Sequence, residues 1–114
     1  MSMFSSLNSL QGYVKVVTDR EQLITSNMAN IDTPGYQTKD FNFQTAVREA
    51  MNSEGTAQFE PASMELIGLP ERPDGNNVNI DRESMLLSQT QLQYKMGVQL
   101  EQSTLQTLYT AIKE

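Results

Sequence analysis

The side chains that carry most enzyme chemistry are missing from this chain of 114 residues. It contains no histidine and no cysteine, which excludes imidazole and thiolate metal sites and a Ser-His-Asp triad. Carboxylates such as Asp32, Asp40 and Glu49 could act as acids or bases, but no spacing in the sequence brings them together. We therefore predict no catalytic, cofactor-binding or metal-binding residues, and we expect these carboxylates to be solvated.

The charge balance disfavours two further classes of function. The chain has 8 basic and 14 acidic residues, a net charge of -6, and no cluster of lysine or arginine. Nucleic acids and anionic membrane surfaces both require a basic footprint. No apolar run reaches the roughly 18 residues of a membrane span, and residues 1–11 lack the basic and apolar regions of a cleaved signal peptide. We expect no nucleic-acid partner, no direct membrane span and no cleaved signal.

The polar residues with the most informative spacing lie between Asn27 and Tyr36. Pro34 disfavours a helical conformation at Thr33, so a helix must end before it. Pro34-Gly35 fits the centre of a type II turn, which needs a positive φ at Gly35. Nearby polar side chains can satisfy backbone groups freed at a helix end. We predict a turn of defined structure, made by Asn27, Ala29, Asn30, Asp32, Thr33, Pro34, Gly35 and Tyr36.

A long helix must precede this turn. Apolar residues alternate in steps of four and three, with one position taken by Glu21, which is a heptad pattern typical of helix pairing. An ordinary helical bundle would show the same pattern. The predicted seam consists of Met3, Leu7, Leu10, Val14, Val17, Ile24, Met28 and Ile31.

A second long helix is predicted at the other end of the chain, with Asn79 or Asp81 as its N-cap. Its predicted pairing residues are Ile80, Leu87, Tyr94, Val98, Leu105, Leu108 and Ile112. A second stripe, made of Met85, Leu92, Met96 and Leu100, indicates that this helix touches more than one neighbour. A broad buried face within one monomer is the alternative.

The middle of the chain differs from both ends, since it holds all four prolines. A short helix is predicted near 43–51, and 59–69 could be extended. The predicted fold is mainly α, with the two end helices pairing as an antiparallel coiled coil. We expect one domain, 1–114, divided into an N-terminal helix (1–31), a connecting arm (32–79) and a C-terminal helix (80–114).

Three strings resemble a known family. Residues 29–36, ANIDTPGY, are similar to the A-N-x-x-T-P-G-Y signature of bacterial flagellar axial proteins, the rod and hook subunits. Residues 74–83, DGNNVNIDRE, and 91–94, QLQY, resemble strings of the FlgB-type proximal rod proteins. The sister FlgC type fits the C-terminal strings less well. The resemblance covers both ends of the chain and little of residues 37–72.

The resemblance implies a structural subunit that assembles helically into the hollow drive shaft of the basal body and transmits torque. Its implied partners are copies of itself, other rod proteins, the basal ring or its adaptor protein, and the flagellar type III export apparatus. Its implied location is the periplasmic rod, reached without a cleaved signal peptide.

Two other classes of function stay open on the sequence. A soluble helical export chaperone or adaptor would also be small, acidic and amphipathic. It would stay in the cytoplasm, whereas a rod subunit co-purifies with basal bodies. An enzyme using the carboxylates is the remaining alternative, and no motif supports it.

Overall fold

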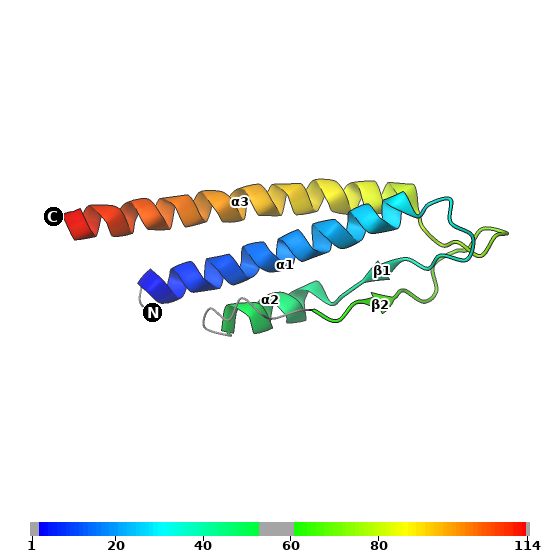
Figure 1. Ribbon diagram of the computed structural model, residues 1–114, viewed down its shortest axis with the longest axis horizontal. Coiled ribbons are helices and arrows are strands. Elements are labelled where there is room, and N and C mark those ends of the chain that lie inside the picture. Colours follow the sequence, from blue (N-terminus) through cyan, green and yellow to red (C-terminus); the bar gives the residue numbers. More distant parts are fainter. Residues whose placement is uncertain (1–2, 53–60, 114) are drawn as a thin grey trace.

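The computed structural model describes residues 3–52 and 61–113. Its elements follow the order α1 (Met3–Ala29), β1 (Lys39–Asp40), α2 (Phe43–Asn52), β2 (Met64–Glu65) and α3 (Ile80–Lys113). The molecule is elongated, with extents of 65 × 22 × 17 Å. The two long helices lie side by side and run antiparallel, and both chain ends lie at the same end of the molecule (Figure 1). The predicted mainly helical fold is confirmed.

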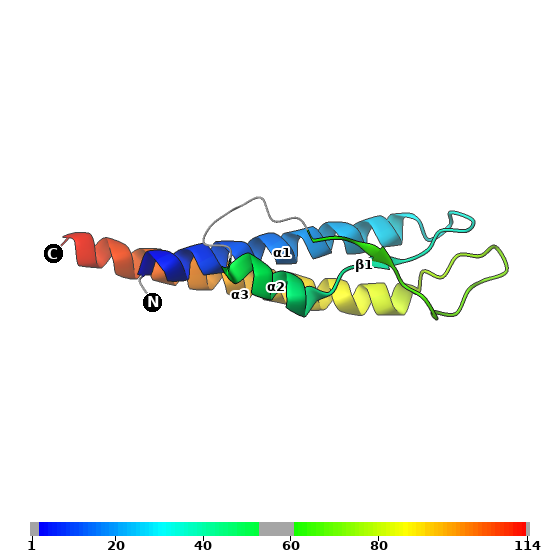
Figure 2. The ribbon, with the colours of Figure 1, turned by 90° about the horizontal axis from the view of Figure 1, so that it is seen from below.

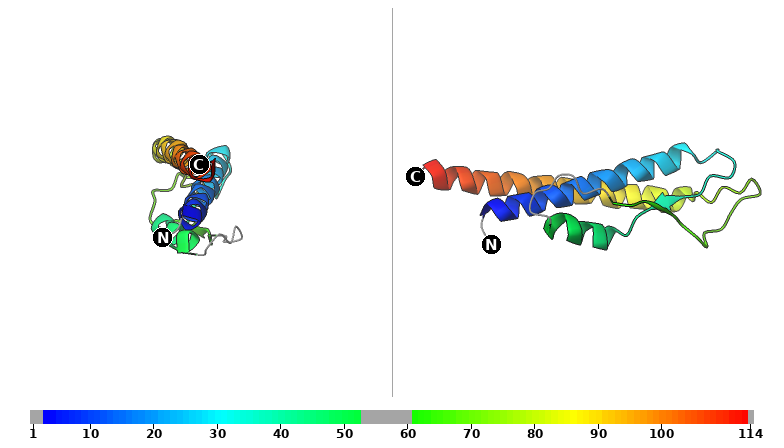
Figure 3. Two further views of the ribbon diagram at one scale, coloured as in Figure 1. Left: turned by 90° about the vertical axis from the view of Figure 1, so that its left-hand side faces the viewer. Right: turned by 60° about the horizontal axis from the view of Figure 1, so that its bottom comes forward.

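Helix α1 forms the central layer of the molecule. It contacts α3 on one side and α2 and β1 on the other, as the end-on view also shows (Figure 3). The two strands form a short antiparallel pair, with Lys39 opposite Glu65 and Asp40 opposite Met64. This pair and α2 lie along one side of α1 (Figure 2), so the connecting arm folds back onto the first helix.

Asparagine side chains fix where the second and third helices begin. The Asn42 Oδ1 atom accepts a hydrogen bond from the backbone N–H of Thr45 at 3.1 Å. The Asn79 Oδ1 atom accepts from the backbone N–H groups of Asp81 and Arg82 at 2.9 and 3.1 Å. Each satisfies donors that an uncapped helix start leaves free. Of the two N-caps considered for the last helix, Asn79 is the one used.

The first helix ends two residues before the predicted position. Beyond Ala29, the N–H groups of Ile31 and Thr33 bond to Met28 and Asn30, three residues back in each case. These bonds belong to turns rather than to an α-helix. Pro34 stops the helix, as predicted, and the chain tightens into turns before it reaches the proline.

The apolar core between α1 and α2 is small. Its buried members are Val16, Phe41, Ala46 and Ala50, and Leu23, Phe43 and Val47 pack against them. Alanines on the buried face of α2 allow the two helix backbones to approach closely. The closest approach is at Gly12, where an added Cβ would lie 2.7 Å from the Ala50 carbonyl oxygen.

Replacing Gly12 with alanine should therefore destabilise the fold by about 1–3 kcal/mol, because backbone must move to admit one methyl group. This loss is expected even though helix propensity favours alanine over glycine by about 1 kcal/mol. Urea unfolding followed by circular dichroism measures the effect. Gln11→Ala, at the exposed neighbouring position, is the control, and a Gly12→Ala chain more stable than the parent would contradict the close approach.

Candidate functional site

The turn after α1 has the predicted geometry. The Tyr36 N–H donates to the Thr33 carbonyl at 3.2 Å, and Gly35 has a φ of 76°, which an L-residue with a Cβ rarely adopts. The side chains of Asp32, Thr33 and Pro34 are exposed. The turn thus presents a fixed backbone shape at the tip of the molecule, away from both chain ends (Figure 1).

Asn76, which is fully buried, holds this turn in place. Its Nδ2 group donates to the carbonyls of Asn30, Ile31 and Thr33 at 2.9, 3.1 and 2.8 Å. Its Oδ1 atom accepts from the Val78 N–H at 2.8 Å. One side chain from the loop before α3 therefore ties down three carbonyls of the turn that follows α1, in addition to the bonds that these carbonyls accept from Thr33, Tyr36 and Arg72.

Further bonds join the two loops at the tip. The Gly35 N–H donates to the Asp74 carbonyl at 2.8 Å, and the Asn77 Oδ1 atom accepts from the Thr38 N–H at 2.6 Å. Gly75 packs against Gly35, since a Cβ added to Gly75 would lie in van der Waals contact with the Gly35 Cα, at 3.4 Å. The strings 29–36 and 74–83, which carry the family resemblance, therefore form one structural unit, called here the asparagine lock.

Asn27 extends the lock into the interface between the long helices. Its Oδ1 atom accepts from the Tyr36 hydroxyl at 2.9 Å and the Lys39 N–H at 3.0 Å. Its Nδ2 group donates to the Lys39 carbonyl and to Glu83 Oε1, both at 2.8 Å. The Asn27 amide makes four hydrogen bonds, its full capacity, and is 1% exposed. It connects α1, the start of the arm and α3.

Beside the lock, two buried carboxylates are paired with arginines. Asp40 Oδ2 lies 3.0 Å from Arg20 and 3.4 Å from Arg82. The second carboxylate, Glu83, accepts from Arg82 at 2.6 Å. These pairs neutralise charges that burial would otherwise penalise. Asp40 is thus buried and paired, contrary to the expectation that it is solvated, because β1 carries it against α1 and α3.

Asp32 and Glu49, the other two carboxylates considered for chemistry, are exposed as expected. Asp32 lies at the tip and Glu49 on α2, so the structure does not bring the three together. In the described part of the chain, no group of three acidic, histidine or cysteine side chains converges to hold a metal ion. Neither long helix, over its described residues, has an apolar stretch of the length a membrane crossing requires.

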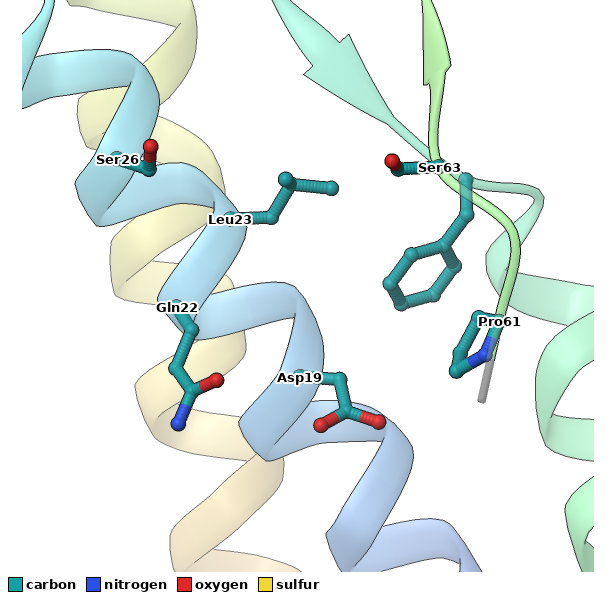
Figure 4. Close-up of a pocket in the computed structure, with 7 residues that line it drawn as sticks. Asp19, Gln22, Leu23, Ser26, Pro61 and Ser63 are labelled. Atoms are coloured by element: carbon teal, nitrogen blue, oxygen red, sulfur yellow. The ribbon is translucent and has the colours of Figure 1, made fainter. Parts of the chain in front are cut away.

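An open hollow lies between α1 and the segment that leads into β2 (Figure 4). Its volume is about 250 Å³, and it is lined by Asp19, Gln22, Leu23, Ser26, Phe41, Pro61 and Ser63. The lining carboxylate, that of Asp19, is 2.8 Å from the Lys15 ammonium group. Its charge is therefore already balanced, and the hollow presents no acid–base pair.

The predicted seam of α1 lies on its inner side where its side chains are described, and Met3 falls outside them. Val17 and Ile24 are buried, and five other predicted residues are partly buried, namely Leu7, Leu10, Val14, Met28 and Ile31.

Tyr13 lies beside this line, against α3, and burial raises the pKa of its phenol above the ordinary value of 10.0. Burial of the neutral Tyr13 phenol thus stabilises the fold fully below pH 10, and this stabilisation is lost as the pH rises through the raised pKa.

The predicted seam of α3 is placed differently. Leu87, Val98 and Leu108 are partly buried, whereas Ile80, Tyr94, Leu105 and Ile112 are between 42% and 73% exposed. The residues of α3 that are buried are Glu83, Leu86, Thr90 and Gly97. Within one chain, α1 therefore packs on a line of α3 beside the predicted one.

Helix α3 consequently carries two exposed apolar faces. The methionine face consists of Met85, Leu92, Met96 and Leu100, each more than half exposed. The tyrosine face consists of Ile80, Tyr94, Leu105, Tyr109 and Ile112. Helical spacing places the two faces on opposite flanks of the line that meets α1. Large apolar side chains exposed along one face of a helix are typical of protein–protein contact sites.

Sequence reasoning missed Asn76, Asn77 and Glu83 as interface residues. All three lie in the string 74–83, and the resemblance of that string gave none of them a contact. Their partners lie 39 to 56 residues earlier in the chain, so local patterns carry no signal for them. The family string 74–83 was the one available indication.

No protein-family model matches the chain. The curated proteins to which it is similar define a class, the rod proteins of the flagellar basal body. They are FlgB proteins: that of Salmonella typhimurium is 26% identical, and the similarity covers 96% of this chain and 94% of the relative. The FlgB of Bacillus subtilis is 25% identical, and the similarity covers 98% of this chain and 97% of the relative. The FlgB of Escherichia coli is 28% identical, and the similarity covers 82% of this chain and 83% of the relative. The predicted resemblance to FlgB proteins is confirmed.

Proposed function

We propose that this chain is a structural subunit of the flagellar basal body rod, of the FlgB type. In the proximal rod, it would assemble helically with copies of itself and other rod proteins into a hollow shaft that transmits torque. The observation that carries the proposal is the pair of apolar faces on α3, which no described part of the same chain covers. Similarity to FlgB proteins along nearly the whole chain supports it.

The distribution of charge also suits side-by-side packing of copies. Helix α1 has Lys15 and Arg20 against Asp19 and Glu21, and is neutral. Helix α3 is neutral too, with three basic and three acidic residues: Arg82, Lys95, Lys113, Asp81, Glu83 and Glu101. Since the chain carries -6 in total, its net charge lies outside the two helices. Copies can bring these helices together without mutual repulsion.

The further partners and the location belong to the same proposal. The partners are the basal ring or its adaptor protein and the flagellar type III export apparatus, and the location is the periplasmic rod. We propose no enzymatic activity, no cofactor and no nucleic-acid partner. The motif turn from Asn27 to Tyr36 would keep the tip rigid, and the predicted pairing residues exposed on α3 would contact neighbouring subunits.

The alternatives are less well supported. The similar proteins named above are all FlgB proteins, which favours this type over the sister FlgC type. No structural observation favours an export chaperone. The asparagine lock fixes an exposed turn, and such a turn has no evident use in an export chaperone.

Deleting the gene in its own host should abolish motility and leave basal bodies without a rod, because each missing subunit layer interrupts the shaft. Motility assays and electron microscopy of purified basal bodies measure both effects. Restoring the gene in trans is the control. A deletion strain that swims normally would overturn the proposal, and a chain found in the cytoplasm but never with basal bodies would point to the chaperone.

A further inference from the structure

The line of α3 that meets α1 has no large apolar side chain at its centre, and Leu86 is buried beside that centre. Its centre consists of Glu83, Thr90 and Gly97, all buried and spaced by seven residues. The methionine face and the tyrosine face carry larger apolar side chains, yet both stay exposed. Burial of apolar area alone would favour one of these faces as the contact with α1. Some other interaction must therefore select the observed line.

One selecting contact is the hydrogen bond from Asn27 Nδ2 to Glu83 Oε1, 2.8 Å long and fully buried. The second carboxylate oxygen, Oε2, accepts from Arg82 at 2.6 Å. With any other face of α3 turned toward α1, Asn27 would lose this acceptor. A buried polar group left without its partner is strongly unfavourable, whereas the satisfied pair costs little.

The other selecting contact is steric and lies further along the same interface. A Cβ added to Gly97 would lie 2.9 Å from Val14 Cγ2 and 3.4 Å from Tyr13 Cδ2. Because Gly97 has no side chain, Val14 and Tyr13 can occupy the space in which one would lie. Thr90, one heptad away along α3, has a side chain that would collide with them in a slipped alignment.

The two contacts have matching separations. Tyr13 and Asn27 are fourteen residues apart on α1, and Gly97 and Glu83 are fourteen residues apart on α3. Fourteen residues are two heptads, so one antiparallel alignment satisfies both contacts. A slip by one heptad breaks both at once.

We propose that the Asn27–Glu83 hydrogen bond and the Val14/Tyr13–Gly97 contact form a specificity key, which selects the face and alignment of α3 that meet α1. The key keeps the methionine and tyrosine faces free. That consequence rests on the proposed function, in which copies use these faces, but the selection itself is a property of the single chain. A single buried polar residue has the same use in coiled coils, where it fixes register at some cost in stability.

Cysteine reactivity tests the key, since the chain has no cysteine of its own. Two reporters are placed singly in the full chain: Leu86→Cys at a buried position, and Leu92→Cys on the methionine face. With no other change in the chain, the thiol at position 92 should react with a maleimide on the order of tenfold faster than the thiol at position 86. Reaction of the buried thiol at position 86 requires local opening of the structure. In the Asn27→Leu/Glu83→Leu background we expect this ratio to fall toward one, since α3 can then turn other faces to α1.

Gln93→Leu is the matched control. It also replaces a partly buried polar side chain of α3 with leucine, but it lies outside the key, and its Oε1 atom has no partner among the described residues. The reactivity ratio should stay at the parent value. Gly97→Leu, which leaves Asn27 and Glu83 in place, tests the steric half separately and should also lower the ratio.

The proposal fails if both key variants remain helical by circular dichroism and keep the parent ratio. It also fails if both lose their helices while Gln93→Leu stays folded, because the key would then stabilise the pair without selecting among alternatives. Either failure is observed on the isolated chain and leaves the motility test of the proposed function unaffected.

Discussion

Replacing Asn76 with alanine should unfold the tip of the molecule and lower the stability of the whole chain by about 3 kcal/mol or more. The change leaves the buried Val78 N–H without its acceptor, which costs about 1–3 kcal/mol. It also removes the donor to three carbonyls, which keep their other partners, and each lost bond of this kind costs about 0.5–1.5 kcal/mol. At about 4 °C per kcal/mol for a chain of this size, the melting temperature should fall by roughly 12 °C. Thermal unfolding followed by circular dichroism gives both quantities.

Asn79→Ala provides the comparison. It removes an asparagine that caps α3 from an exposed position, and loss of an N-cap costs about 1 kcal/mol. Equal losses in the two variants would mean that Asn76 is no more than a second cap, and the idea of a lock joining the two loops would have to be abandoned.

Introducing charge on the methionine face should abolish motility without affecting the folded chain. In Leu92→Glu/Met96→Glu, both substituted side chains are more than half exposed in the single chain, so stability should change by about 0.5 kcal/mol or less at each site. Between neighbouring subunits the same carboxylates would be buried without partners, which is strongly unfavourable. Swimming in soft agar and the yield of rods in basal bodies are the measurements.

Gln99→Glu/Gln106→Glu is the charge-matched control, because both glutamines are exposed on α3 and helical spacing places them between the two apolar faces. It should support motility at or near the parent level. If the Leu92→Glu/Met96→Glu strain swims as well as this control, the methionine face does not contact a neighbour in the rod.

The helices and the turn could be predicted because their signals are local. Heptad spacing indicates α1 and α3, and Pro34 and Gly35 impose the turn through their own backbone preferences. The face of α3 that meets α1 could not be predicted in this way. A hydrophobic pattern selects Ile80, Tyr94 and Leu105, whereas the chain buries Glu83, whose partner lies 56 residues away. The buried state of Asp40 was missed for the same reason, since it depends on two arginines brought in by other elements.

The antiparallel layout also determines how the chain resists force. Both chain ends lie at the same end of the molecule, opposite the asparagine lock (Figure 1). A pull that separates the two ends loads the contacts between α1 and α3 one turn at a time, as in opening a zipper. A push along the long axis compresses both helices in parallel and does not separate them. The fold is therefore mechanically anisotropic: it is soft to peeling from its ends and stiff along its length, and the lock is the last part that peeling reaches.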